Sequence, residues 1–145
     1  FNYRMTEMQA VVGKAQLKKI KKIFYEGKKR YSIIEKLLSR NIKRRRIPYL
    51  STPNFDTFIF FVPEKNKRIE IINYLNKIRL GTKNIPSALQ WHCAFYWDHI
   101  FKKKELKHFK KTDIILKRSI AIPILIKKKI SFYKMIVEKI NEILI

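Results

Sequence analysis

The sequence has little cysteine, glycine or proline, and each scarcity excludes a class of protein. Its single cysteine, Cys93, rules out an intrachain disulfide and favours a reducing compartment, so we expect a cytoplasmic location. Three glycines and five prolines are too few for a low-complexity or collagen-like chain. The longest apolar runs, FIFFV and IAIPILI, are far shorter than the roughly 20 residues of a membrane-spanning helix. With no signal-peptide pattern either, we expect no membrane partner.

Acidic residues are also scarce. The chain has 11 Asp and Glu against 34 Lys and Arg, which gives a net charge of +23. Such an excess is typical of proteins that bind nucleic acid or another polyanion. The basic residues are mostly lysine and are spread along the chain, with patches only at 43–46 and 101–111. A phosphate-reading surface would favour arginine, whereas lysine and isoleucine accumulate in AT-rich genes. We therefore expect only non-specific binding to nucleic acid.

The first part of the chain is predicted to be helical. Thr6 to Gln9 reads T-E-M-Q, which is a capping box in which the hydroxyl of the first residue and the side chain of the last bond to each other's backbone. Apolar residues then follow at helical spacing to about Ser39, with a bend expected near the lysines at 18–22 or at Gly27. Gly13, inside this helix, indicates close packing against another helix.

The second part is predicted to alternate strands and helices. Strands are expected at 57–62 and at 119–125, where Pro123 indicates an edge or the end of the strand. Helices are expected at 66–80, at 112–118 with Thr112 as the N-cap, and from about Ser131. The predicted inward stripe of the 66–80 helix is Ile69, Ile72, Leu75 and Ile78. That of the last helix is Tyr133, Ile136, Val137, Ile140 and Ile143.

This order of elements predicts an α/β (α+β) fold. We divide the chain into a long helical segment, 1–40, and a small α/β domain, 41–145. The segment between 87 and 101 is dense in aromatic residues and has no clean period, so it is predicted to be irregular.

The opening NYRMTEMQAVVGKAQL resembles the NYRM-T/S-E-x-Q-A-x-x-G-x-x-Q-L stretch of the fold-type I, pyridoxal-phosphate-dependent sugar aminotransferases. The matching residues are Asn2, Tyr3, Arg4, Met5, Thr6, Glu7, Gln9, Ala10, Gly13, Gln16 and Leu17. The segments KKRYSIIEKLL, TFIFFV, RIEIINYL and SIAIPI follow the order of the family. The resemblance therefore covers nearly the whole chain and identifies it as the C-terminal small domain of such an enzyme, preceded by a long helix.

A narrower resemblance concerns the aromatic segment. GTKNIPSALQWHCAFYWDH is similar to a loop of the branch that aminates position 8 of a 3-deoxy-octulosonate, a sugar acid of lipopolysaccharide. One departure lies at Phe95 and Tyr96, where the branch has a glycine. Because of this added bulk, the sequence does not assign the identity of the sugar substrate.

The resemblance implies a transamination. An amino group passes, usually from glutamate, to a keto group on a sugar, with pyridoxal 5'-phosphate as cofactor. In the family, the lysine that holds this cofactor as a Schiff base lies upstream of the NYRM stretch. We therefore assign no catalytic residue in this chain and expect the chain alone to be inactive.

The resemblance also implies which residues bind the cofactor. It places Asn2 at the cofactor phosphate of the partner subunit, so that the 1–40 segment is a dimer and cofactor contact and the active site of a homodimer is shared. An amide can donate to a phosphate oxygen, and Arg4 can add charge-assisted hydrogen bonds to phosphate or to a substrate carboxylate. The alternative for both residues is that they only shape the entrance of the helix.

The same resemblance places Trp91, His92 and Trp97 against the sugar substrate. A tryptophan can stack on a sugar face, and a histidine can hydrogen-bond a hydroxyl or a carboxylate; core packing and a structural histidine are the alternatives. A metal site is not expected, because the spacing of His92, Cys93, Asp98 and His99 matches no zinc pattern.

The isolated chain is expected to fold poorly. In the family this domain packs on a large domain and on a second subunit, so its apolar faces would be exposed when it is alone. We expect self-association or a molten state. The alternative function is a basic module that binds nucleic acid or another polyanion without catalysis.

Overall fold

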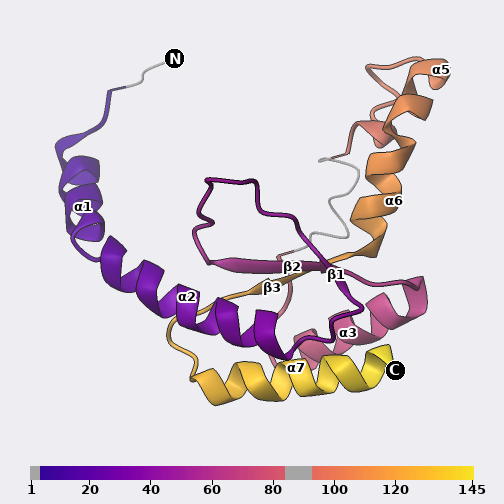
Figure 1. Cartoon of the computed structure of the whole chain (residues 1–145). Helices are drawn as coiled ribbons and strands as arrows, with labels where there is room; N and C mark the ends of the chain where they lie inside the picture. The colour runs from indigo at the N-terminus through magenta and orange to yellow at the C-terminus, as the bar shows by residue number, and fades with distance from the viewer. Residues whose placement is uncertain (1–3, 84–92) are drawn as a thin grey trace.

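The structure is a computed structural model that describes residues 4–83 and 93–145. A small body of sheet and helices carries two projecting arms (Figure 1). One arm ends in α1 (Glu7–Leu17), and the other is built by α5 (Lys103–Leu106) and α6 (Lys110–Arg118). The predicted fold class is confirmed, because helices and a three-stranded antiparallel sheet share one core.

Two helices with a bend between them form the N-terminal segment. Thr6 caps α1 as predicted: its hydroxyl accepts from the Gln9 amide at 3.3 Å, and the Gln9 side chain accepts from the Thr6 amide at 3.0 Å. α1 ends at Leu17 and α2 (Ile20–Leu37) follows. The bend therefore lies at residues 18 and 19, at the start of the predicted lysine run, and α2 continues unbroken through Gly27.

The three strands lie in the order β1, β2, β3, and both pairs are antiparallel. Their bounds are β1 (Lys43–Arg44), β2 (Thr57–Phe61) and β3 (Ser119–Pro123). The last two were predicted, and β3 ends at Pro123, which has no backbone N–H for a sheet ladder. β1 was not predicted, because two basic residues carry no alternating apolar pattern and the strand exists only through its pairing with β2.

The register of the sheet shows which of its side chains share the face that packs in the core. Phe58 pairs with Ile122, and Phe60 pairs with Ile120, so these four side chains lie on one face and are almost fully buried. Helices α2, α3 (Lys65–Lys77) and α7 (Ile130–Leu144) complete the core. The prediction for α7 is confirmed, since all five residues of its predicted stripe are buried.

The predicted stripe of α3 is wrong in part. Leu75 is buried as expected, but Ile71 is also fully buried and Ile69 is 45% exposed. The helix is rotated because Arg68 turns inward, where its Nε donates to the Ser119 carbonyl at 2.9 Å. Isoleucines occupy positions 69, 71 and 72, so the predicted and the observed rotation of the helix both give it an apolar stripe. The long-range hydrogen bond of Arg68 favours the observed rotation.

A short 3₁₀ turn, η2 (Ala94–Tyr96), lies in the aromatic segment, and a second, η3 (Lys107–Phe109), follows α5. The latter runs directly into α6, so the helix begins at Lys110 and Thr112 lies inside it. The predicted cap at Thr112 is therefore wrong. Phe109 packs on Phe101 with their ring centroids 5.2 Å apart, and this contact holds the chain in helical conformation before the threonine is reached.

Arg30 joins α2 to the loop before α7. Its Nε donates to the Lys128 carbonyl at 2.8 Å and its Nη2 to the Ile126 carbonyl at 2.7 Å. Its Nη1 donates to the Glu26 carboxylate at 2.7 Å. The side chain is buried, and its charge is matched by this set of acceptors. Within the described residues, no helix is both long and apolar enough to cross a bilayer.

Candidate functional site

The structure describes two of the five predicted site residues. Arg4 and Trp97 lie in the described ranges, whereas Asn2, Trp91 and His92 lie outside them. The site can therefore be built from two elements, the segment that enters α1 and the aromatic arm that contains Trp97.

Arg4 lies two residues before the N-cap of α1 and is exposed. The capping box at Thr6 sets the direction in which the chain enters the helix. A helix N-terminus carries partial positive charge and free backbone N–H groups, and a guanidinium adds a full charge with paired donors. This end of the arm is suited to a phosphate or a carboxylate.

α1 presents apolar side chains that no other described part of the chain covers. None of its residues is buried, and Met8 is 79% exposed and Val11 67% exposed. The close helix packing expected at Gly13 is not found among the described residues, where a Cβ at this position meets no atom within 4 Å. A helix of this length is marginal by itself in water.

Trp97 belongs to an aromatic cluster in the opposite arm. Its ring is nearly parallel to that of Phe101, with an interplanar angle of 7° and centroids 6.4 Å apart. Phe101 in turn packs on Phe109. Part of the Trp97 ring is therefore used for packing, and the remainder is partly exposed.

A buried carboxylate anchors the turn before Trp97. The Tyr96 hydroxyl donates to the Asp113 carboxylate at 2.6 Å, and the Lys117 ammonium donates to it at 2.8 Å. The side chain of Asp113 is only 6% exposed, so these two donors offset the cost of burying its charge. The hydrogen bond to Asp113 is the main reason why the pKa of Tyr96 and the pKa of Lys117 are both raised.

Sequence analysis missed this anchor. The spacing of Asp113 and Lys117 on one helix is a readable signal for an ion pair, but nothing local links them to Tyr96. The contact explains the departure noted at 95–96. The aromatic residue there fastens η2 to α6, which a glycine could not do.

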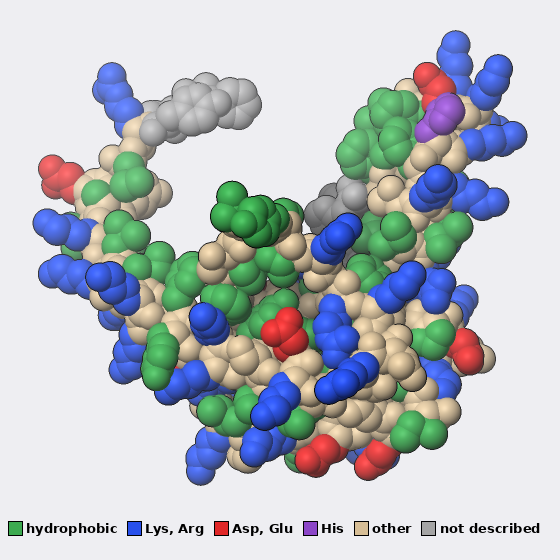
Figure 2. Space-filling model, viewed as in Figure 1, with side chains coloured by type: hydrophobic (Ala, Val, Ile, Leu, Met, Phe, Trp, Pro, Cys, Tyr) green, Lys and Arg blue, Asp and Glu red, His purple; other side chains and the backbone are tan. Residues whose placement is uncertain are grey.

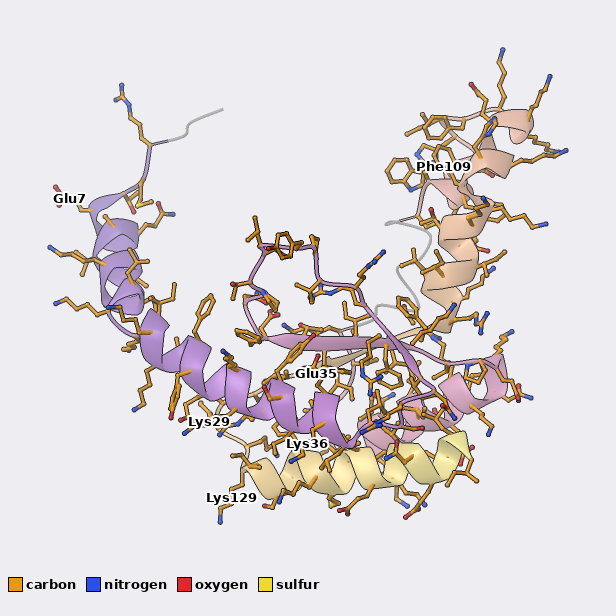
Figure 3. All side chains as sticks on the ribbon, in the orientation of Figure 1. Glu7, Lys29, Glu35, Lys36, Phe109 and Lys129 are labelled. Carbon is orange, nitrogen blue, oxygen red and sulfur yellow. The ribbon has the colours of Figure 1, made fainter. Side chains whose placement is uncertain are left out.

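The structure does not bring Arg4 and Trp97 together. They belong to the two arms, whose separation is seen from Glu7 and Phe109 at opposite sides of the molecule (Figure 3). The loop between β1 and β2 stands between the arms (Figure 1). In residues 4–83 and 93–145, no group of three or more His, Cys, Asp or Glu side chains is placed to hold a metal ion.

The chain is similar to known proteins in both sequence and fold. The sequence matches the model of the DegT/DnrJ/EryC1/StrS aminotransferase family over residues 1–141. The fold is similar to that of a proposed sugar aminotransferase from Streptococcus pneumoniae in its apo form, with a TM-score of 0.75 and 18% identity. That match covers 97% of this chain and 35% of the other, so the chain spans about a third of the length of this relative. A search of curated proteins found no match.

Proposed function

The chain belongs to the DegT/DnrJ/EryC1/StrS aminotransferase family, and we propose that it is the C-terminal part of a pyridoxal-phosphate-dependent sugar aminotransferase. The enzyme would transfer an amino group from glutamate to a keto-sugar in the cytoplasm. We propose the 8-keto form of a 3-deoxy-octulosonate as the sugar, and lipopolysaccharide or cell-surface polysaccharide biosynthesis as the process. The family match over residues 1–141 carries this proposal.

A large domain is proposed to complete the enzyme and to provide the lysine that holds the cofactor. Two observations support this. The chain covers 35% of the solved relative, and the apolar face of α1 has no cover within the described residues. Because α1 ends an arm that extends from the body (Figure 1), we propose that it reaches a second subunit and that the enzyme is a homodimer with shared active sites.

The residues before α1 are proposed to bind the cofactor. Pyridoxal phosphate, when bound, supplies the electron-withdrawing ring on which amino transfer depends. The donor set fits its phosphate: the Arg4 guanidinium would donate charge-assisted hydrogen bonds, the Asn2 amide would be a neutral donor, and the positive end of α1 follows these residues in the sequence. The capping box of Thr6 and Gln9 would orient this segment.

The aromatic arm is proposed to bind the sugar. Trp91, His92 and Trp97 would contact it, with the tryptophans against its faces and the histidine on a hydroxyl or carboxylate. The position of Trp97 depends on its stack with Phe101 and on the neighbouring bond from Tyr96 to Asp113.

The test is made on the complete gene product, in which this chain is joined to any polypeptide encoded before Phe1. We expect the purified protein to carry bound cofactor, whose visible spectrum changes when glutamate is added and returns when the keto-sugar follows. Arg4→Ala and Asn2→Ala should weaken cofactor retention by about tenfold or more. Lys129→Ala, at the start of α7, serves as the control. A complete product that binds no pyridoxal phosphate would refute the proposal.

A basic polyanion-binding module without catalysis is the alternative, and the surface of the second arm favours it. Positive side chains cover the outer side of α5 and α6 (Figure 2). The exposed lysines there include Lys102, Lys103, Lys104, Lys107, Lys110 and Lys111. Under our proposal, duplex DNA binds weakly, without sequence preference, and is released as salt rises. Sequence-specific binding that resists salt would favour the alternative.

A further inference from the structure

A groove with a volume of about 620 Å³ opens between β1, the end of β2, α6 and the end of α7. The helix α6 that lines it lies on the side of the molecule away from α1 (Figure 1). Its lining is formed by Asn41, Ile42, Lys43, Phe61, Pro63, Ile114, Ile115, Arg118 and Leu144. The volume is in the range of small-molecule sites in proteins, and the proposed function makes no use of it.

The floor and one wall of the groove are apolar. Ile42 and Phe61 come from the neighbouring strands, and Ile114 and Ile115 come from α6. The two α6 isoleucines are 46% and 53% exposed, and the buried position of their helix is occupied by Asp113. Apolar side chains in such a groove contact water when it is empty. Replacing that water with a hydrocarbon group lowers the free energy.

Two cations at the rim of the groove have no counter-charge among the described residues. Lys43 is placed by its pairing with Phe61 across the sheet. Arg118 is placed by a hydrogen bond of 2.9 Å from its Nε to the Val62 carbonyl, which leaves its two Nη groups for another acceptor. Within the described residues, neither side chain forms an ion pair and no acidic residue lines the groove.

We propose that this groove binds a medium-chain fatty carboxylate. The hydrocarbon chain would lie on the isoleucine wall, and the carboxylate would be held by the Arg118 fork with Lys43 beside it. A planar guanidinium donates two parallel hydrogen bonds to the two oxygens of a carboxylate, which selects this head group over a positive or neutral one. The site is independent of the proposed transamination, and its test needs no activity measurement.

The first measurement is calorimetric titration of the complete gene product, in which this chain is joined to any polypeptide encoded before Phe1, with decanoate below its micellar concentration. Citrate serves as an anion without a chain, and decyltrimethylammonium serves as the same chain with a positive head. We expect saturable binding of one decanoate per chain, about tenfold or more tighter than either comparison compound. Citrate binding as tightly as decanoate would overturn the proposal, because net charge alone would then explain the result. Absence of saturable decanoate binding would also overturn it.

Matched variants locate the site. Ile115→Asp places a carboxylate in the groove, and Ile69→Asp makes the same change at an isoleucine of similar exposure on α3. Only the first is expected to weaken decanoate binding, by about tenfold or more. The double variant Lys43→Gln, Arg118→Gln should do the same, whereas Lys77→Gln, Arg79→Gln removes equal charge elsewhere and should not. Equal losses within either pair would refute the groove as the site, and circular dichroism checks that each variant is folded.

Discussion

The Tyr96 hydroxyl donates a 2.6 Å hydrogen bond to the Asp113 carboxylate, which joins η2 to α6 across 17 residues of chain. Lys117, one helical turn beyond Asp113, donates to the other oxygen of the same carboxylate. Tyr96 thus has a structural role in this chain. The arm that contains Trp97 depends on this contact.

Tyr96→Phe is predicted to destabilise the protein by about 1–2 kcal/mol, because a buried charged acceptor loses one of its two donors. The ring is retained, so packing against Phe95 is unchanged. Urea denaturation followed by circular dichroism measures the effect. Tyr49→Phe is the control, since Tyr49 is 92% exposed and its hydroxyl faces solvent. Equal denaturation midpoints for the two variants would contradict the prediction.

The same cluster predicts a loss of stability in alkali. The pKa of Tyr96 is raised above its ordinary value of 10.0, mainly by the hydrogen bond to Asp113, and the pKa of Lys117 is raised for the same reason. A group whose pKa is higher in the folded state stabilises the fold below its unfolded pKa. That contribution disappears as pH rises through the folded value.

The free energy of unfolding should therefore fall as pH rises above about 10. The double variant Tyr96→Phe, Lys117→Gln should be less stable than the wild type near neutral pH and should fall less steeply in alkali. The difference in free energy of unfolding between the wild type and the double variant should become smaller as pH rises, as measured by urea denaturation at several pH values. A difference that stays constant from neutral to alkaline pH would show that the cluster contributes nothing to the titration.

The two helical glycines are predicted to respond oppositely to alanine. At Gly27 a Cβ would lie 3.0 Å from the Phe55 carbonyl oxygen and 3.2 Å from the Phe55 Cβ, so Gly27→Ala should cost about 1–3 kcal/mol. At Gly13 the added methyl meets nothing, and Gly13→Ala should stabilise α1 by about 0.5–1 kcal/mol. Denaturation midpoints test the first effect, and helix content tests the second. Tolerance of Gly27→Ala would mean that Phe55 moves aside.

The apolar face of α1 is predicted to cause self-association of the isolated chain. The triple variant Met8→Gln, Val11→Gln, Val12→Gln should weaken association by about tenfold or more in sedimentation experiments, because it removes exposed apolar area. The unfolding curve should not change, since no residue of α1 is buried. The pair Ile69→Gln, Met135→Gln, at exposed positions of α3 and α7, is the control. If the α1 triple variant and the control pair weakened association equally, a surface other than α1 would mediate it.

The elements that could be predicted are those whose signal is local. The capping box of α1 requires only residues three apart, and the five buried positions of α7 follow from their spacing alone. β1 could not be predicted, because two basic residues become a strand only when β2 lies beside them. The rotation of α3 likewise depends on Arg68 reaching Ser119, a partner 51 residues away.

The candidate site was predictable only through resemblance. Arg4 and Trp97 have no local signal that links them to a cofactor or to a sugar, and the fold sets them on different arms. Tyr96 and Asp113 order one arm, but no periodic pattern in the sequence links them, because Tyr96 lies in a 3₁₀ turn and Asp113 lies in a helix. The groove beside β1 has the same origin in long-range packing, since β1, α6 and the end of α7 meet only in the folded chain.

The pairing of elements that are distant in the chain has a consequence for synthesis on the ribosome. α2 packs on α7, β2 pairs with β3, and Arg30 bonds to carbonyls 96 and 98 residues downstream. The core therefore cannot close until the last helix has emerged from the exit tunnel, and the nascent chain carries its early apolar segments uncovered until then. A translational pause within the last stretch of the message would lengthen the period in which chaperones and proteases have access to it.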